Sequence, residues 1–437
     1  MKRINDERAQ NKQFGEPPMR IKMHHDTETK MTIPAPVIYV MEKLENAGYT
    51  AYAVGGCVRD HLMGRIPGDY DVTTSAKPEE MQKVFSSDRV VETGLKHGTL
   101  TIVKDGMNVE TTTYRIDGTY DDGRHPDSVT FTDRLDDDLC RRDFTINAMA
   151  YNPVRGIVDL WEGREDLKKR SIRCVGAANE RFSEDGLRIL RALRFASVLD
   201  FTPDEECACG VRELKHLLDK ISRERIYAEL TKLICGVGAS RILAEFPEII
   251  AHVLPHMDAD GVKRAAAYIR EDEALVKNGY PKNPGLRYAL LFSSLGEKEA
   301  ADAMNSLKPS RDEKNAVMAF VKKRDGGAEL NKYAVKCLMR DGGDGFPCDL
   351  ARYLCVTGRM TDGELHEAER IAEEILSADE CRRVSQLAVN GQDMMRLGLR
   401  GKEIGDTLAA LLDAVMAEKA ENNAECLLEL AESPKKE

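Results

Sequence analysis

Residues 51–74 read AYAVGGCVRDHLMGRIPGDYDVTT, and they carry the strongest structural signal in the chain. The apolar run over 51–54 predicts a strand, because short apolar runs bounded by glycine are typical of buried strands. Two glycines follow this run, and the next residues predict a helix that begins near residue 58 and ends at residue 64. A second strand is expected to carry the motif Asp-Tyr-Asp. The segment therefore predicts a strand, a glycine turn, a helix and a second strand, in that order.

The glycine turn and the start of the helix indicate phosphate binding. Gly55 and Gly56 have no side chains, so their backbone N–H groups can approach phosphate oxygens closely. The N-terminus of the following helix adds partial positive charge, and Arg59 adds a full one. A Gly-Gly pair alone is usually only a turn, so this interpretation depends on the acidic motif that follows.

Asp69 and Asp71 predict a metal site. On a strand, residues two apart point to the same face, so the two carboxylates are expected side by side. Two negative charges this close repel each other unless a cation lies between them. Hard oxygen ligands beside a phosphate site suit Mg²⁺, and they favour nucleotidyl transfer with two metal ions about 3.5–4 Å apart. The whole segment resembles the nucleotidyltransferase head of the polymerase-β superfamily.

Length and composition indicate a globular chain with several domains. The 437 residues are 42% hydrophobic and 32% charged, which suggests roughly two to four domains. The sequence holds no apolar run of the roughly 18 residues that a membrane span requires. Its eleven cysteines are scattered without a CxxC pair, which favours reduced thiols in the cytoplasm over a zinc site. The net charge of −11 argues against general nucleic-acid binding, although a local basic face can still bind RNA.

The residues around this segment outline the rest of the first domain. Residues 34–47 predict a helix, and residues 90–103 predict two strands joined by a turn. Residues 108–115 alternate as a strand that carries Glu110. Glu110 is either a third carboxylate, which completes the metal site or orients a primer hydroxyl, or an exposed strand residue. Residues 116–133 consist largely of Asp, Thr, Gly, Ser and Pro, and this composition predicts a loop.

Residues 141–153, RRDFTINAMAYNP, contain candidate nucleotide ligands. Arg141 and Arg142 offer planar sets of donors for a triphosphate. Asp143 and Asn147 are four residues apart and are expected on one helical face, where both can hydrogen-bond a sugar hydroxyl. The alternative is a helix cap at Asp143 with ion-paired arginines.

A helix predicted over residues 181–199 carries candidates for recognition of a base. Asp185 and Arg188 share one face of this helix, which Arg191 and Arg194 continue. A carboxylate accepts from an exocyclic amine and a guanidinium donates to a ring nitrogen or carbonyl, so the first two residues could accept C and A and reject U and G. The alternative is a weak surface ion pair on an amphipathic helix.

Beyond about residue 163 the sequence is almost wholly helical in pattern. Further helices are predicted over residues 222–235, 238–253, 258–278, 283–294, 296–306 and 310–324. A glycine-rich break over residues 341–345 indicates a domain boundary, and residues 389–432 close the chain with helices after glycine hinges.

These motifs, in this order, resemble those of the class II tRNA nucleotidyltransferases (the CCA-adding enzymes) and of their close relatives, the bacterial poly(A) polymerases. The motifs are GGCVRD, DYD, TGLKHGT, DGRHP, RRDFTINAMAYNP, SEDGLRILRALRF, SRERI and NGQDMM with GKEIGDTL, within about residues 31–432. The resemblance implies an α/β nucleotidyltransferase head similar to polymerase β, followed by an all-α neck, body and tail in an elongated multidomain molecule. It implies a disordered leader over 1–30, the head over 31–160, a nucleotide-selecting neck over 161–236, the body over 237–345 and a tRNA-binding tail over 346–437.

The resemblance also implies an activity and a set of functional residues. The reaction is the addition of C, C and A to the 3′ acceptor end of tRNA from CTP and ATP, without a nucleic-acid template and with two Mg²⁺ ions. By motif, Asp69 and Asp71 bind metal, Gly56, Arg59 and Arg142 contact phosphates, Asp143 contacts the ribose, and Asp185 and Arg188 select the base with support from Arg191 and Arg194. No membrane and no protein partner is expected.

Two details favour the full CCA-adding reaction among these relatives. TGLKHGT resembles the CCA-adding pattern, where poly(A) polymerases carry a basic, aromatic replacement, and residues 116–133 resemble the flexible loop with which CCA-adding enzymes switch from CTP to ATP. RYALLFSSLG lacks a His-Asp pair, so no phosphohydrolase activity is expected. The alternatives are an A-adding or CC-adding partner enzyme, a poly(A) polymerase and, from another class, a non-catalytic RNA-binding relative, against which the intact Asp-x-Asp motif speaks.

Overall fold

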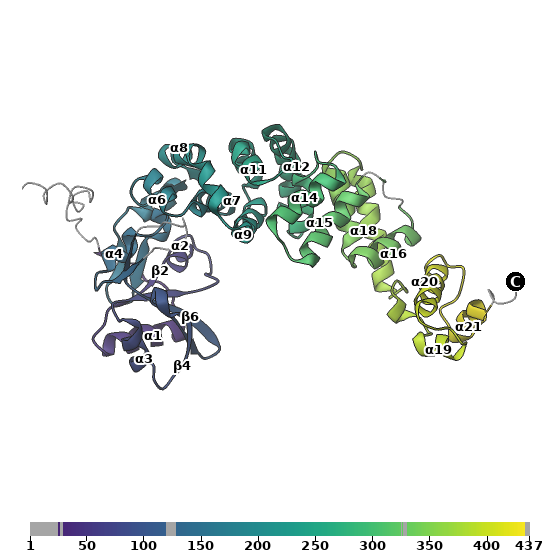
Figure 1. Ribbon diagram of the computed structural model, residues 1–437, viewed down its shortest axis with the longest axis horizontal. Coiled ribbons are helices and arrows are strands. Elements are labelled where there is room, and N and C mark those ends of the chain that lie inside the picture. The colour runs from purple at the N-terminus through teal and green to yellow at the C-terminus, as the bar shows by residue number, and fades with distance from the viewer. Residues whose placement is uncertain (1–24, 27–28, 119–127, 325, 327–329, 433–437) are drawn as a thin grey trace, which may run out of the picture. The chain divides into compact units, whose positions relative to one another are not determined.

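The computed structural model describes residues 25–26, 29–118, 128–324, 326 and 330–432, and these form two compact units (Figure 1). Unit 1 comprises the chain up to residue 196 together with residues 201–221, and unit 2 comprises residues 197–200 and those from 222 onward. Most of the predicted leader lies outside the described residues, but His25–Asp26 within it form strand β1, which pairs with β10. The five predicted domain segments remain a prediction.

Unit 1 is built on a mixed sheet, which has eight strands within the described residues, in the order β1-β10-β9-β2-β3-β6-β5-β4. The strands after β1 are β2 (Ala51–Val54), β3 (Asp71–Thr74), β4 (Arg89–Gly94), β5 (Thr99–Lys104), β6 (Met107–Thr113), β9 (Met149–Asn152) and β10 (Gly156–Asp159). Strand β3 is antiparallel to β2 and parallel to β6. The strand that begins at Asp71 and the strand that carries Glu110 are therefore neighbours.

Apolar side chains project from both faces of this sheet into buried clusters. Ala51 and Ala53 of β2 belong to one buried cluster, with helices α1 (Ala35–Asn46) and α3 (Pro78–Val84). Tyr52 and Val54 of the same strand belong to a second cluster, with Leu139 of α4 (Leu135–Cys140). Successive strand residues point to opposite faces, so β2 is fully buried, as its apolar run predicts.

Shorter elements complete unit 1. The helices are α2 (Gly56–Leu62), α5 (Gly163–Lys169), α6 (Ala178–Glu184), α7 (Leu187–Leu199) and α8 (Glu205–Glu213), of which α7 continues into unit 2. Two small sheets pair β7 (Arg115–Asp117) with β8 (Val129–Phe131), and β11 (Ser171–Ile172) with β12 (Thr202–Pro203). The predicted loop over 116–133 is thus wrong at both ends, which form strands, and its centre with Arg124 and His125 lies outside the described residues.

The helix predicted over residues 181–199 is also wrong, because the chain breaks it in two. Helix α6 ends at Glu184, Asp185 has extended dihedral angles (φ −139°, ψ 105°), and α7 begins at Leu187. Gly186 lies in the break, where an added Cβ would stand 2.9 Å from the carbonyl oxygen of Leu217. The close approach of another chain segment therefore fixes the break at a glycine.

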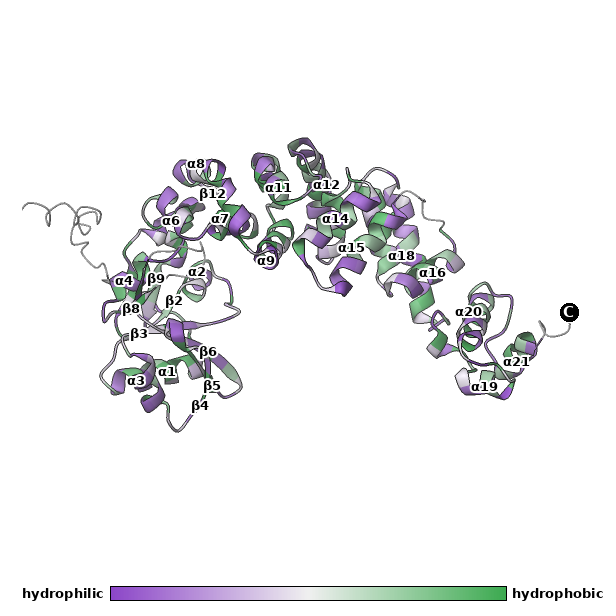
Figure 2. Ribbon diagram, in the orientation of Figure 1, coloured by the Kyte–Doolittle hydropathy of each residue, from purple (hydrophilic) through white to green (hydrophobic). Residues whose placement is uncertain are grey.

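Unit 2 is helical, and in Figure 2 its helices carry both hydrophobic and hydrophilic residues. They are α9 (Arg223–Ile234), α10 (Ala239–Glu245), α11 (Pro247–Val253), α12 (Ala259–Lys277), α13 (Pro284–Leu291), α14 (Glu297–Leu307), α15 (Arg311–Lys323), α16 (Lys332–Gly342), α17 (Phe346–Val356), α18 (Asp362–Ser377), α19 (Gly391–Arg396), α20 (Lys402–Met416) and α21 (Ala424–Glu432). The single helix predicted over 238–253 is two helices, because Pro247 lacks an N–H group and starts α11. Within the described residues, no helix combines the length and the hydropathy needed to cross a membrane.

A fully buried carboxylate joins three helices of unit 2. Asp272 of α12 has no exposed surface and forms ion pairs with Arg287 of α13 and Arg352 of α17. Removing one partner from such a group leaves a buried charge uncompensated, which costs about 3–5 kcal/mol. This cluster is important for the stability of unit 2 and lies far along the chain from the predicted site residues.

Candidate functional site

The predicted acidic residues meet where β3 and β6 run side by side. Asp71 is the first residue of β3 and pairs in register with Glu110 of β6. Asp69 lies just before β3 and not on a strand, which corrects the predicted position. Although Asp71 reaches the surface, desolvation by nearby atoms, followed by the charges of Asp69 and Glu110, raises its pKa to about 6. The three carboxylates therefore repel one another.

This crowding of negative charge is the arrangement that a cation would relieve. The charge of Arg142 acts against the raised pKa of Asp71 but does not cancel the effect. Asp69 and Asp71 supply hard oxygen ligands, which fit Mg²⁺. In the described part of the chain, no three His, Cys, Asp or Glu side chains are grouped as a metal site. The chemistry of the carboxylate pair fits the ion, and metal binding by Asp69 and Asp71, like the role of Glu110 as a third ligand, stays a prediction.

The predicted glycine turn lies against Arg142. Gly55 has a φ of +80° and a ψ of −126°, a conformation that residues with a Cβ rarely adopt. An added Cβ at Gly55 would stand 3.1 Å from Nη1 of Arg142. Helix α2 then begins at Gly56, two residues earlier than predicted. The turn and the guanidinium are therefore in contact, close to Asp71.

Cys57, the next residue of α2, is a buried thiol beside this turn. Its side chain is buried, and burial, followed by the charge of Asp71, raises its pKa to about 11. The thiol is therefore protonated at neutral pH.

Arg59 of α2 forms a hydrogen bond with the segment that is predicted to contact the sugar. Its Nη1 donates to Oδ1 of Asn147 at 2.7 Å, and its Nη2 lies 2.8 Å from Oδ1 of Asp60. Asn147 in turn donates through Nδ2 to Oδ1 of Asp143 at 3.1 Å. These contacts bring Arg59, Asn147 and Asp143 together, and the binding roles of the three residues stay predictions.

Asp143 is nearly buried and firmly ionised. Burial acts to raise its pKa, but the charges of Arg191 and Arg188 outweigh this effect and hold the pKa well below its usual value. Nε of Arg191 donates to Oδ2 of Asp143 at 2.9 Å, and Nη2 donates at 2.5 Å. The predicted shared helical face is wrong, because Asp143 precedes the short 3₁₀ turn that ends at Asn147. The turn brings the two side chains together instead.

The two residues predicted to read the base are close in sequence but have different partners. Oδ1 of Asp185 accepts from the backbone N–H of Leu187 at 3.0 Å. Arg188 donates to Glu184 at 2.5 Å and to the carbonyl oxygen of Arg141 at 3.0 Å, with only 9% of its surface exposed. Arg188 is therefore anchored to the chain around it, and base reading by this pair stays a prediction.

Two residues near the site, Phe195 and Asp138, were missed by sequence reasoning. Phe195 of α7 lies under three predicted site residues, with its ring centre 3.7 Å from the guanidinium carbon of Arg194, 5.2 Å from that of Arg59 and 5.5 Å from that of Arg191. Buried Asp138 of α4 accepts hydrogen bonds from both Arg141 and Arg142. The sequence signal for Asp138 is its spacing, three and four residues before the two arginines.

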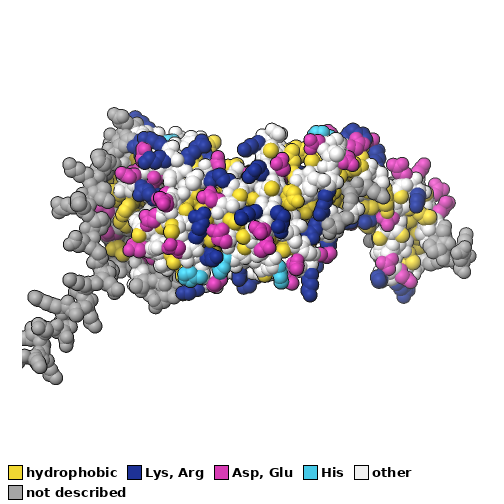
Figure 3. All heavy atoms as spheres, turned by 90° about the horizontal axis from the view of Figure 1, so that it is seen from above, with side chains coloured by type: hydrophobic (Ala, Val, Ile, Leu, Met, Phe, Trp, Pro, Cys, Tyr) yellow, Lys and Arg dark blue, Asp and Glu magenta, His cyan; other side chains and the backbone are white. Residues whose placement is uncertain are grey.

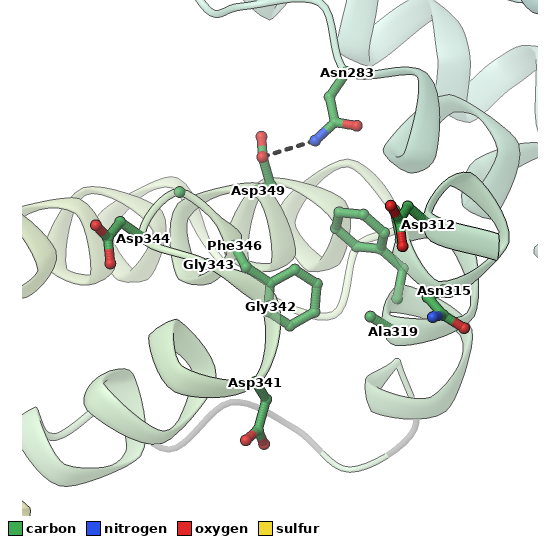
Figure 4. A pocket seen from close by; sticks show the side chains of 13 residues that line it. Asn283, Asp312, Asn315, Ala319, Asp341, Gly342, Gly343, Asp344, Phe346 and Asp349 are labelled. Carbon is green, nitrogen blue, oxygen red and sulfur yellow. Dashed lines mark hydrogen bonds between the residues drawn. The ribbon is translucent and has the colours of Figure 1, made fainter. Parts of the chain in front are cut away.

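A cavity of about 400 Å³ in unit 2 is separate from these residues (Figure 4). Its lining includes Asp312, Asp341, Asp344 and Asp349, and Asn283 donates to Asp349 at 2.7 Å. None of the predicted site residues lines it. Four carboxylates around one cavity would repel a triphosphate, so this cavity does not compete with the site in unit 1.

Comparisons with known proteins place the chain among relatives of known family. Family models match residues 51–173 (poly A polymerase head domain), 200–260 (RNA and SrmB-binding site of polymerase A) and 285–431 (tRNA nucleotidyltransferase domain 2). The CCA-adding enzyme of Limosilactobacillus reuteri is 37% identical over 91% of this chain and 96% of its own length. The CCA-adding enzyme of Geobacillus kaustophilus is 34% identical over 88% of this chain and 93% of its own.

A solved structure gives the same result for the fold. The crystal structure of the Bacillus stearothermophilus CCA-adding enzyme in complex with CTP matches with a TM-score of 0.76 and 30% identity, over 92% of this chain and 98% of that chain. The relatives are therefore similar along nearly their whole length, in the head as well as in the helical part. The chain belongs to the family of the CCA-adding enzymes.

Proposed function

We propose that this protein adds C, C and A to the 3′ end of tRNA from CTP and ATP and releases pyrophosphate, without a nucleic-acid template. The observation that carries this conclusion is the contact between the glycine turn and Arg142, beside the mutually repelling carboxylates of Asp71 and Asp69. Such a site suits a triphosphate and its metal ions. Similarity to CCA-adding enzymes over nearly the whole chain supports the same reaction.

In this proposal the residues of unit 1 divide the work of binding and orientation. Asp69 and Asp71 would hold two Mg²⁺ ions, which when bound would neutralise charge on the triphosphate and lower the pKa of the attacking hydroxyl. Backbone N–H groups at Gly56, together with Arg59 and Arg142, bind the phosphates. The 3′ oxygen of the RNA forms a bond to the α-phosphorus as the bond to pyrophosphate breaks. Glu110 either orients that 3′ hydroxyl or completes the metal site.

Recognition of the nucleotide is assigned to α7 and the segment before the 3₁₀ turn. Asp143 accepts from a ribose hydroxyl, and its bonds to Arg191 and Asn147 hold the carboxylate in place. Asp185 and Arg188 select C and A, and Arg194 supports the nucleotide from the same helix. The extended backbone at Asp185 supports this role, because it sets the side chain at the start of α7.

The RNA partner in this proposal is tRNA, and the compartment is the cytoplasm. The match of residues 200–260 to an RNA-binding family model supports the partner. On the face drawn in Figure 3, acidic and basic side chains are mixed, so tRNA binding there relies on local basic groups. The eleven cysteines, all of them free, support a reducing compartment.

The product added to a tRNA that lacks its CCA end tests the proposal. With CTP, ATP and Mg²⁺ we expect the addition of C, C and A, and Asp69→Ala should abolish addition while tRNA binding is retained. Addition of C alone, of A alone or of a long A tract would instead identify a CC-adding enzyme, an A-adding enzyme or a poly(A) polymerase. RNA binding without any addition by the native protein would identify a non-catalytic relative.

A further inference from the structure

Asp138 is a buried carboxylate that no motif assigns to the site. It lies in α4 with no exposed surface. Its Oδ1 accepts from Nε and Nη2 of Arg141 at 2.9 and 2.7 Å. Its Oδ2 accepts from Nη2 of Arg142 at 3.2 Å and from the hydroxyl of Thr73 at 3.1 Å. Both oxygens therefore accept hydrogen bonds from protein side chains.

The partners of Oδ2 connect Asp138 to the site. Thr73 lies on β3 two residues after Asp71, so its side chain anchors the carboxylate to the strand that begins the metal site. Arg142 is bound through Nη2 to Asp138, while its Nη1 is the atom that lies against Gly55. Nη2 of the planar guanidinium is thus held by Asp138, and Nη1 is directed to the glycine turn.

The carboxylate remains charged in this environment. Burial acts to raise the pKa of Asp138, but the charges of Arg141 and Arg142 outweigh it and hold the pKa below its usual value. A buried ionised carboxylate is stable only when it is paired and hydrogen-bonded, as here. Charge-assisted bonds to arginine are strong and directional, so they restrict rotation of the Arg142 side chain.

The partner of Oδ1 extends this connection to a second element. Nη1 of Arg141 lies 3.5 Å from Oδ2 of Asp117 on β7. Both ends of the Arg141 guanidinium are used by carboxylates, so its predicted contact with a triphosphate stays a prediction. Of the two neighbouring arginines, Arg142 is the one directed to the turn.

We infer that Asp138 is a positioning residue, which fixes the guanidinium of Arg142 toward the glycine turn for the phosphates of the incoming nucleotide. Asp138 does not touch the nucleotide and acts only through Arg142. This inference rests on the proposed function for the identity of the ligand. It deepens that proposal by naming the residue that holds the phosphate contact in place.

The first test is the variant Asp138→Asn, which keeps the shape of the side chain and removes its charge. We expect KM for CTP and ATP to rise about tenfold, because a charged hydrogen bond to Arg142 is lost, while KM for tRNA and kcat change little. Asp272→Asn is the matched control, since Asp272 is also fully buried between two arginines but lies in unit 2. The control should lower thermal stability and leave KM for both nucleotides unchanged.

A double-mutant cycle separates positioning from a general structural effect. In the background Arg142→Ala, Asp138→Asn should change nucleotide KM less than about twofold, because its effect acts through the missing arginine. Equal increases in KM with and without Arg142 would overturn the inference, as would an unchanged KM in folded Asp138→Asn. A native enzyme that fails to add CCA would contradict the proposed function instead.

A second variant keeps the test decisive if Asp138→Asn does not fold. Thr73→Val removes one donor to Oδ2 without changing the size of the side chain. We expect a smaller rise in nucleotide KM, about two- to fivefold for one lost hydrogen bond, which disappears in the Arg142→Ala background. An unchanged KM in folded Thr73→Val, with Asp138→Asn unfolded, would overturn the inference.

Discussion

Three positive charges gather around one aromatic ring at the core of the candidate site. Arg59, Arg191 and Arg194 all lie within 5.5 Å of the ring centre of Phe195, which is itself only 5% exposed. Like charges this close repel, and the negative face of an aromatic ring offsets part of that repulsion. The ring thus helps to hold together arginines that come from two different helices.

Replacement of this ring should therefore weaken nucleotide binding. We expect Phe195→Leu to raise KM for CTP and ATP severalfold and to lower the free energy of unfolding by about 1–2 kcal/mol. Nucleotide kinetics and thermal unfolding measure the two effects. Phe182→Leu, at a fully buried ring in the same unit, is the control. If both variants changed KM equally, the arginines around Phe195 would not be the cause.

The carboxylate of Asp71 is expected to lower the stability of the metal-free protein, although nucleotide addition requires it. Its pKa is raised to about 6 by desolvation and by the charges of Asp69 and Glu110, so at pH 7 the group is mostly ionised, at a cost in free energy that the unfolded chain does not have. A raised carboxyl pKa makes the folded state more favourable when the group is protonated, so this destabilisation should fade as the pH falls from 7 to 5. Asp71 reaches the surface, and water screens the effect.

Asp71→Asn should accordingly stabilise the metal-free protein at pH 7, by at most about 1 kcal/mol, while abolishing nucleotide addition. The gap between variant and native protein should shrink toward pH 5. Addition of Mg²⁺ with CTP should raise the melting temperature of the native protein more than that of the variant. A variant that is less stable than the native protein at pH 7 would show that the carboxylates do not repel.

At the scale of elements, the sequence predicts those strands and helices whose formation depends on a local pattern of residues. The apolar run over 51–54 and the helical periodicity over 34–47 match β2 and α1, because burial of one strand or one helix face shows in the local pattern. The pairing of Asp71 with Glu110 depends on the parallel register of β3 and β6, which are far apart in sequence. The hydrogen bonds of Asp138 and the helix break at Gly186 likewise depend on tertiary contacts, so no local sequence pattern predicts them.

The break between α6 and α7 gives a prediction at this scale. Gly186→Ala would place a methyl group 2.9 Å from a carbonyl oxygen of the backbone, so the chain must shift. We expect a loss of about 1–3 kcal/mol in the free energy of unfolding, and weaker discrimination of C and A against U and G, because Asp185 moves with the break. Gly405→Ala, in helix α20 with open space around it, should instead be neutral or stabilising by up to about 1 kcal/mol. Misincorporation assays and urea unfolding provide the two measurements.

At the scale of the molecule, the predicted site residues all belong to unit 1, while the family model for tRNA nucleotidyltransferase domain 2 matches residues of unit 2. The RNA-binding family model over 200–260 includes the junction between residues 221 and 222. Each unit has its own buried core and its own buried carboxylate between arginines, Asp138 in one and Asp272 in the other. Units of this kind commonly unfold as separate steps.

The two units should therefore respond separately to the loss of one buried charge. We expect Asp272→Asn to lower the midpoint of one calorimetric transition, by an amount equivalent to about 3–5 kcal/mol, and to leave the transition of unit 1 in place. Asp138→Asn should have the complementary effect. A single transition that moves as a whole in both variants would mean that the units fold as one.

The protonated thiol at Cys57 has a consequence for resistance to chemical damage. Only the thiolate reacts readily with alkylating agents and peroxides, and with a pKa of about 11 this buried sulfur forms almost none of it. Cys57 lies beside Asp71, which is predicted to bind metal, so oxidation there would disturb the candidate site. Because this thiol is buried and stays protonated, we expect it to resist both alkylation and peroxide.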